Sequence, residues 1–170
     1  MNRLSEGPVI VGDILFDRGK IDKCIRVRIG SGGTAISSSS ETTITGPEAV
    51  LPAQAIVLDV YVNVLVASTG STKTFGFGLL NSSAGGNRIG FLTGISAAAT
   101  GLQLPVIAVG TSGAGTYGVF LSVFSTGNAP AQKSFATDSV TAKTLTFTPN
   151  STDWVLFSAD VYICYVDLTK

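Results

Sequence analysis

Histidine is absent from this chain of 170 residues, and cysteine occurs only twice, at Cys24 and Cys164. Without histidine there is no Ser–His or Cys–His nucleophile pair and no imidazole ligand for a metal ion. Two cysteines alone do not complete a zinc site. The chain therefore lacks the residues of the common nucleophilic hydrolases and of histidine-bound metal centres. We expect a protein that is not an enzyme and has no catalytic residue, no metal ion and no cofactor.

Charged side chains are also scarce. They make up 13% of the chain, whereas soluble domains carry roughly a quarter. Between Lys73 and Asp138 the only charged residues are Arg88 and Lys133. The mean hydropathy is +0.42, yet no apolar run is long enough to span a bilayer, so we expect no membrane partner. We interpret the uncharged stretch as surface that other copies of the chain, or a larger assembly, cover.

The basic residues that are present gather near the N-terminus. The net charge is zero, and a nucleic-acid binder normally has a basic excess because phosphate contacts dominate its affinity. We therefore expect no nucleic-acid partner. Six of the eleven basic residues nevertheless lie within the first 28 positions, among four acids. One interpretation is an ordinary solvated surface. The other is a docking strip made of Arg18, Lys20, Lys23, Arg26 and Arg28.

The N-terminus does not have the pattern of a secretory signal. Met1 is followed by Asn-Arg-Leu-Ser-Glu-Gly-Pro, without a basic segment and an apolar segment in succession. We therefore expect synthesis in a cytoplasm, where thiols are kept reduced. The spacing of Cys24 and Cys164 leaves open whether the two thiols pair in the folded protein.

Alternating patterns predict an all-β fold. The chain has 18 Ser, 19 Thr and 20 Gly, which favour strands and turns over helix interiors. Strands are predicted at 8–17, 24–29, 56–67, 73–80, 103–109, 116–124, 143–148 and 155–168. About eight strands with no helices between them indicate an antiparallel β-sandwich with a jelly-roll-like arrangement. We expect one domain over 1–170, with 1–30 as a candidate N-terminal arm or docking segment.

The alternation also predicts which side chains point outward. In 24–29, Cys24, Arg26 and Arg28 share the outward face. In 56–67 we expect the even-numbered residues from Ile56 to Val66 to form one face. In 73–80, Gly76 and Gly78 share a face, which allows another backbone or ring to approach closely.

Other polar and aromatic residues suggest weaker sites. Asp138, Asp153 and Asp160 are the late acids, but nothing in their spacing pairs two carboxylates as a glycosidase requires. Trp154 has two interpretations: packing in a core or interface, which we favour, or stacking against a sugar.

One segmented pattern resembles a known family. Leu51-Pro-Ala-Gln-Ala-Ile-Val opens a strand, a Thr-Lys-Thr strand follows at 72–78, and a Gly-Gly loop leads to Gly-Phe-Leu-Thr-Gly at 90–94. A Thr-Phe-Thr strand begins at Thr146. Together these segments resemble head decoration or cement proteins of tailed bacteriophages. Family members tend to have acids in the Gly-Gly loop, where this chain has Asn87 and Arg88.

The resemblance implies a non-enzymatic virion protein. Such a protein is made in the bacterial cytoplasm and packs as a homo-oligomer, commonly a homotrimer, on the capsid surface against the major capsid protein. The docking strip around Arg26 and Arg28 would then contact an acidic shell surface. The alternative is a β-sandwich module of a phage tail or fibre that binds host glycan through Trp154 and nearby loops.

Overall fold

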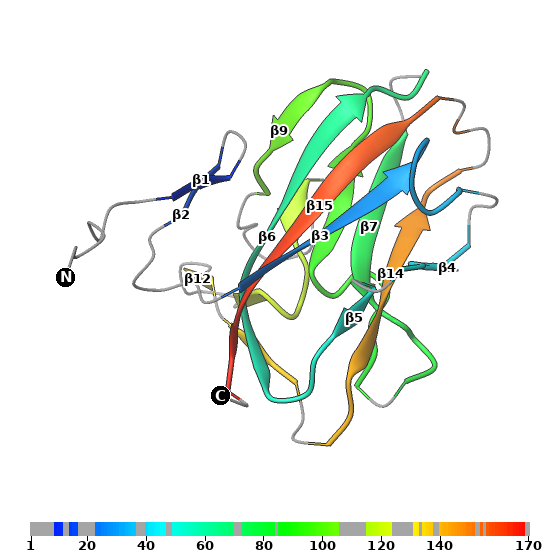
Figure 1. Ribbon diagram of the computed structural model, residues 1–170. Coiled ribbons are helices and arrows are strands. Elements are labelled where there is room, and N and C mark those ends of the chain that lie inside the picture. Colours follow the sequence, from blue (N-terminus) through cyan, green and yellow to red (C-terminus); the bar gives the residue numbers. More distant parts are fainter. Residues whose placement is uncertain are drawn as a thin grey trace.

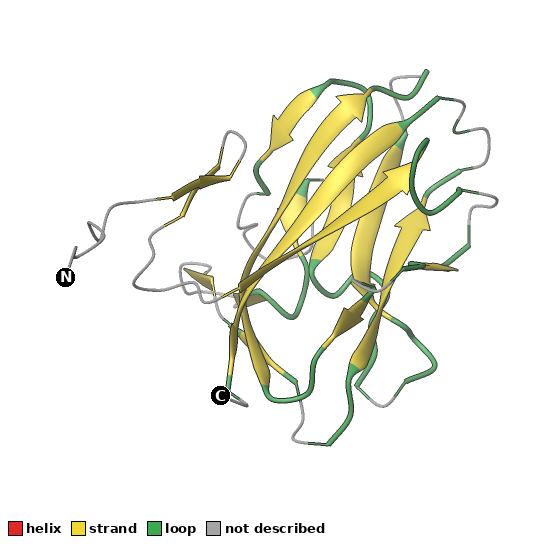
Figure 2. Cartoon of the chain, viewed as in Figure 1, coloured by secondary structure: helices red, strands yellow, loops and turns green. Residues whose placement is uncertain are grey.

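Two antiparallel β-sheets pack face to face in the computed structural model (Figure 1). The structure describes residues 9–11, 14–16, 23–36, 40–46, 49–69, 73–83, 85–105, 115–123, 131–132, 134–137, 140–151, 154 and 156–168. Figure 2 shows strands and loops but no helix within these ranges. The predicted all-β sandwich is confirmed, while the jelly-roll-like arrangement stays a prediction.

The first sheet places the C-terminal strand beside the strand that begins at Lys23. Its order is β13 (Phe135–Ala136), β6 (Ala55–Val66), β15 (Ser158–Asp167) and β3 (Lys23–Gly30), with β9 (Gly101–Gln103) also paired to β6. β15, drawn in orange-red in Figure 1, therefore runs between β6 and β3. The C-terminal strand β15 therefore lies inside the sheet, and β3 forms the edge beside it.

The second sheet covers the other side of the core. Its order is β10 (Thr116–Tyr117), β8 (Leu92–Ser96), β7 (Thr74–Leu79), β14 (Lys143–Pro149) and β4 (Thr42–Thr43), with β5 (Val50–Leu51) also paired to β14. Two small hairpins complete the described strands: β1 (Val9–Val11) with β2 (Ile14–Phe16), and β11 (Ser122–Val123) with β12 (Ala131–Gln132).

Strands occupy the segments predicted at 24–29, 56–67, 73–80 and 143–148, and the one predicted at 155–168 begins only at Ser158. The segments predicted at 8–17 and 116–124 each hold two short strands, β1 with β2 and β10 with β11, instead of one. β8 was not predicted, because Gly94 interrupts its alternation. The strand predicted at 103–109 is instead the short β9, which ends at Gln103, and residues 106–110 lie outside the described ranges. The predicted arm at 1–30 is too long, because β3 is an integral strand of the sandwich with Ile25, Val27 and Ile29 in its core.

A β-bulge corrects the predicted faces of β6. Cys164 is aligned with Asp59 and Tyr165 with Val57, so one extra residue, Leu58, lies opposite this step of β15. Val60, Val62 and Val64 are buried as expected. Before the bulge the buried residue is Val57, and the prediction that Ile56 and Leu58 face inward is wrong. Val66, at the other end of the predicted face, is 44% exposed, beyond a second register shift. An inserted residue reverses the alternation of a strand, and a simple two-residue period cannot show it.

The prediction for the glycine face of β7 is confirmed. A Cβ atom on Gly78 would lie 2.1 Å from the carbonyl oxygen of Asn87, and one on Gly76 would lie 2.5 Å from the Cγ2 of Ile89. The backbone N–H of Leu79 donates to the carbonyl of Asn87 at 2.9 Å. The glycines therefore let the segment around 87–90 lie directly against the strand.

Candidate functional site

The outward face of the first sheet gathers polar and aromatic side chains in three rows. Alternate residues of β3 and β15, including Val27 and Val161, are buried in the core, so their neighbours point the other way. Strand register aligns these neighbours with residues of β6. We call this set the outer patch: Arg28, Asp160 and Asn63; Arg26, Tyr162 and Tyr61; Cys24, Cys164 and Asp59.

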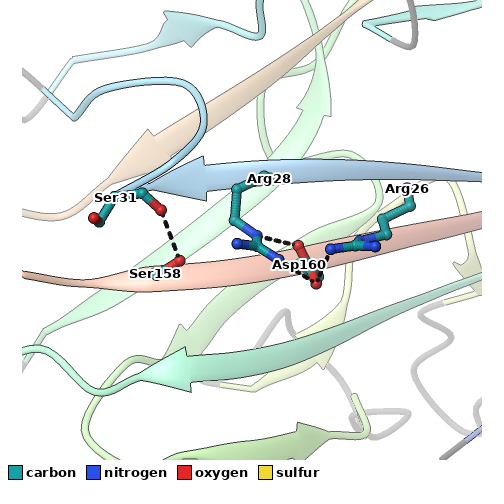
Figure 3. A network of polar contacts seen from close by, with 5 residues as sticks. All are labelled: Arg26, Arg28, Ser31, Ser158 and Asp160. Atoms are coloured by element: carbon teal, nitrogen blue, oxygen red, sulfur yellow. Dashed lines mark hydrogen bonds and ion pairs between the residues drawn. The ribbon is translucent and has the colours of Figure 1, made fainter. Parts of the chain in front are cut away.

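Asp160 is the centre of an ion-pair network (Figure 3). Arg28 donates to Asp160 through Nε, and its Nη2 reaches Oδ2 at 3.0 Å. The Nη2 of Arg26 approaches the same Oδ2 at 3.0 Å. The Asp160 side chain is only 4% exposed, whereas that of Arg26 is 54% exposed. Two guanidinium groups therefore compensate one buried carboxylate, as a buried charge requires.

The ion-pair network keeps Arg28 charged, and a nearby hydrogen bond attaches the turn after β3 to β15. Its hydrogen bond to Asp160 raises the pKa of Arg28 above the ordinary value, so this guanidinium stays charged. Two residues before Asp160, the hydroxyl of Ser158 donates to the carbonyl oxygen of Ser31 at 3.0 Å (Figure 3). These contacts fix the C-terminal end of β3 and the turn after it against β15.

Acids of the same chain therefore largely neutralise the three described cations of the predicted docking strip. Lys23 forms an ion pair with Asp167, and Arg26 and Arg28 share Asp160, which leaves one positive charge in excess among these five groups. Arg26 holds the most exposed of the three cationic groups. Arg18 and Lys20 lie outside the described residues. Sequence reasoning missed both acidic partners, because the pairing of β3 with β15 joins residues more than 130 positions apart.

Asp59 forms a second network that the sequence did not indicate. Its carboxylate accepts hydrogen bonds from the hydroxyls of Tyr61 at 2.7 Å and Tyr117 at 2.6 Å, and from the backbone N–H of Val60 at 2.8 Å. Burial, followed by the hydrogen bond to Asp59, raises the pKa of both tyrosines above the ordinary value. Tyr117 belongs to the second sheet, so this carboxylate connects the two sheets.

The two cysteines meet at the end row of the outer patch. Cys24 and Cys164 are register partners in β3 and β15, and their Sγ atoms lie 3.5 Å apart. Both side chains are thiols in the structure, Cys24 exposed and Cys164 buried with Tyr61 and Tyr162 packed against it. The spacing left this pairing open, and only the strand register shows it.

Exposed aliphatic residues border the outer patch on the β9 side. Leu102 is aligned with Asn63, and Leu65 is the next outward residue of β6. Leu65 and Leu102 are each 38% exposed. We call these two leucines the apolar rim. The rim thus adds apolar surface beside charges that are paired within the chain.

Trp154 has a packing role. It is 8% exposed, and its ring contacts those of Phe75, Phe147 and Phe157 with centroids 5.0 to 6.3 Å away. Its Nε1 donates to the carbonyl of Ser151 at 2.7 Å. This placement favours the packing interpretation and leaves the ring no open face for a sugar. The predicted stacking of Trp154 against a sugar is therefore wrong for the described structure.

Of the three late acids, the structure describes only Asp160. Asp160 is engaged by two arginines, while Asp138 and Asp153 lie outside the described residues. Among the described positions there is no cluster of three or more metal-ligating side chains. No helix within the same positions is long and apolar enough to cross a membrane.

A groove lies on the second sheet, over β7 and β14. Its volume is about 350 Å³. The polar side chains along it belong to Thr74, Arg88, Thr93, Thr148 and Asn150. Arg88 is one of the two charged residues in the uncharged stretch. The groove therefore offers hydroxyl and amide groups and one cation, but its aromatic residue, Phe75, is buried.

Comparison of the chain with family models, with curated proteins and with solved structures finds no match. The resemblance to phage decoration proteins therefore rests on the sequence segments that carry it.

Proposed function

We propose that this protein is a non-enzymatic structural subunit of a virion, a decoration or cement protein that assembles on the head of a tailed bacteriophage. In this role it forms a homo-oligomer, with a trimer favoured, and contacts the major capsid protein at the capsid surface. The observation that carries the proposal is the apolar rim beside the outer patch. Leu65 and Leu102 are exposed where the described charges nearby have partners within the chain.

The composition of this surface supports contact with protein. Interface cores are depleted in free charge and enriched in aromatic residues and arginine. The outer patch has Tyr61, Tyr162 and Arg26 in one row across the three strands. Large apolar areas bordered by polar residues commonly mark sites of protein association. The apolar rim is therefore assigned to contact between copies of the chain, and the row with Arg26 to the shell.

Arg26 has the best position for contact with an acidic shell. Its side chain is 54% exposed although it touches Asp160, whereas Arg28 is held more deeply by two hydrogen bonds. Reversal of the charge at Arg28 would disturb the buried carboxylate, so its effect on docking would mix with an effect on folding. Arg26 therefore separates docking from stability better than Arg28 does.

The test is co-sedimentation of the purified protein with empty phage heads at several salt concentrations. We expect Arg26→Glu to lower the bound fraction, with the largest difference at low salt because exposed charges are screened. The matched control is Arg88→Glu, an equal charge change on the opposite sheet. Wild-type protein that never co-sediments, or equal binding by the wild type and Arg26→Glu at all salt concentrations, would reject this docking role.

The groove over β7 and β14 supports a second candidate, a tail or fibre module that binds host glycan. Thr74, Thr148 and Asn150 place hydroxyl and amide groups along it, and such groups orient polar ligands in shallow sites. A glycan-array signal that is lost in Arg88→Ala and kept in Arg26→Ala would favour this candidate over capsid decoration.

A further inference from the structure

We propose that Cys24 and Cys164 form a thiol–disulfide exchange site, a cross-strand dithiol that a small disulfide such as glutathione disulfide oxidises to an intramolecular bond. The bond would join β3 to β15 within the outer patch. This inference goes beyond the proposed function and does not depend on it, because it follows from the positions of the two sulfur atoms alone.

Strand register brings the two cysteines into position. Cys24 and Cys164 are directly opposite each other in the antiparallel pair of β3 and β15. Opposite residues in such a pair have Cα atoms about 4.5 to 5.5 Å apart, which lies inside the usual range for a disulfide. The Sγ atoms are 3.5 Å apart and already in contact. Small side-chain rotations bring them to the bonding distance of about 2.0 Å without moving the strands.

The two thiols differ in their access to a reagent. Cys24 is exposed, and Cys164 is completely buried with Tyr61 and Tyr162 packed around it. The hydrogen bond with Cys24, then burial, raises the pKa of Cys164 above the ordinary value. A glutathione molecule reaches Cys24 but not Cys164. Cys24 is therefore assigned as the attacking sulfur and Cys164 as the resolving sulfur.

The exchange proceeds in two steps. The Cys24 thiolate attacks one sulfur of glutathione disulfide, forming a mixed disulfide and releasing one glutathione thiolate. Cys164 then gives its proton to a base in solution or to the released thiolate, and its sulfur attacks the Cys24 sulfur. The Cys24–Cys164 bond forms, and the second glutathione leaves. The protein loses two electrons and two protons, and glutathione disulfide is reduced to two glutathione molecules.

The bond would secure an edge strand of the sandwich. β3 is the last strand in the order of the first sheet, and it presents Arg26 and Arg28 on the outer patch. A link between Cys24 and Cys164 closes a loop that contains most of the chain, so it restricts the unfolded state strongly. We expect oxidation to raise the midpoint of thermal unfolding by about 10 °C.

Intact-mass measurement after incubation of the purified protein with glutathione disulfide tests the site. We expect the wild type to lose two hydrogen atoms and to yield a non-reduced peptide that links Cys24 to Cys164. We expect Cys164→Ser to keep one glutathione on Cys24, since no resolving sulfur is present. We expect Cys24→Ser to remain unmodified, since the remaining thiol is buried.

Three results would overturn the proposal: an unmodified wild type, a wild type that stops at the glutathione adduct, or a disulfide that joins two chains. Because Cys24 is exposed, Cys24→Ser is expected to fold normally, and far-ultraviolet circular dichroism checks this. If Cys164→Ser fails to fold, the wild type and Cys24→Ser are still sufficient to test the proposal. The wild type shows whether the intramolecular disulfide forms, and Cys24→Ser shows whether its formation depends on Cys24.

Discussion

The hydroxyl of Tyr117 donates a hydrogen bond of 2.6 Å to the carboxylate of Asp59, from one sheet to the other and across 58 positions of the chain. Asp59 sits at the bulge of β6, where the register to β15 shifts. It also accepts a hydrogen bond from Tyr61. The bulge thus places a carboxylate where both sheets supply donors, and bulges commonly redirect a side chain in this way.

Removal of the Tyr117 hydroxyl is expected to destabilise the fold. Tyr117→Phe deletes one hydrogen bond to a charged, half-buried acceptor, which contributes about 2 kcal/mol to the free energy of unfolding. Chemical denaturation measures the loss. The matched control is Tyr162→Phe, whose hydroxyl makes no hydrogen bond to the described part of the chain, and we expect a change within about 0.5 kcal/mol. Equal stabilities for the two variants would show that the Asp59 network is not a structural link.

The tyrosines of the folded protein are expected to ionise at a higher pH than tyrosines of the unfolded chain. Their ionisation is then expected to weaken the fold. The pKa values of Tyr61, Tyr117 and Tyr162 are all raised, with burial as the largest cause. The folded state therefore holds these protons more tightly than the unfolded state does. Their contribution to stability is complete below pH of about 10 and declines as the pH rises above it. Tyrosinate absorbance measures the titration in the native protein and in denaturant, and we expect the native tyrosines to ionise at the higher pH of the two. Coincident titrations with the fold intact would contradict the raised pKa values.

Asp160→Asn should lower the free energy of unfolding more than the loss of the exposed guanidinium of Arg26 does. The substitution leaves two guanidinium groups, Arg26 and Arg28, without their shared anion. We expect the free energy of unfolding to fall by about 3 kcal/mol, since Asp160 is buried. Arg26→Gln removes only the exposed partner, and we expect a loss of about 0.5 kcal/mol. A smaller loss for Asp160→Asn than for Arg26→Gln would mean that the network contributes little to the fold.

Gly78→Ala is expected to displace the segment that lies against β7. The added Cβ would be 2.1 Å from the carbonyl oxygen of Asn87, which belongs to the backbone and cannot move alone. We expect a loss of about 3 kcal/mol in unfolding free energy. Gly85→Ala is the comparison, because its Cβ meets open space and only its left-handed φ of +71° is unfavourable, which costs about 1 kcal/mol. Similar losses in the two variants would show that close approach at Gly78 is unimportant.

Alternation along the sequence was sufficient to predict the fold class and most buried faces. β15 shows this well: Ala159, Val161 and Ile163 are buried, and Tyr162 lies on the other face, as the two-residue period predicts. The two-residue period failed in β6 because the bulge inserts one extra residue, Leu58, and nothing in the amino-acid sequence marks that insertion. Local patterns determine which face is apolar, but they do not show where a strand breaks its register.

The candidate site was only partly predictable, because its pairs join distant positions. Arg26 and Arg28 were expected to be outward, but their partner Asp160 becomes visible only once β3 is known to lie beside β15. The same register brings Cys24 to Cys164. Trp154 was ambiguous because sequence cannot tell a core aromatic residue from an exposed one at a strand entry, and its contacts with Phe75 and Phe157 place it in the core.

The central claim is that the apolar rim is covered by other copies of the chain, and the native mass in solution tests it most directly. Light scattering with size-exclusion chromatography should show an oligomer, with a trimer favoured, for the wild type and for Val140→Glu, a change at a position that is already 83% exposed. Leu102→Glu, placed within the rim, should yield monomers that remain folded. A soluble monomeric wild type over a wide concentration range, with the rim residues accessible to solvent, would contradict the account.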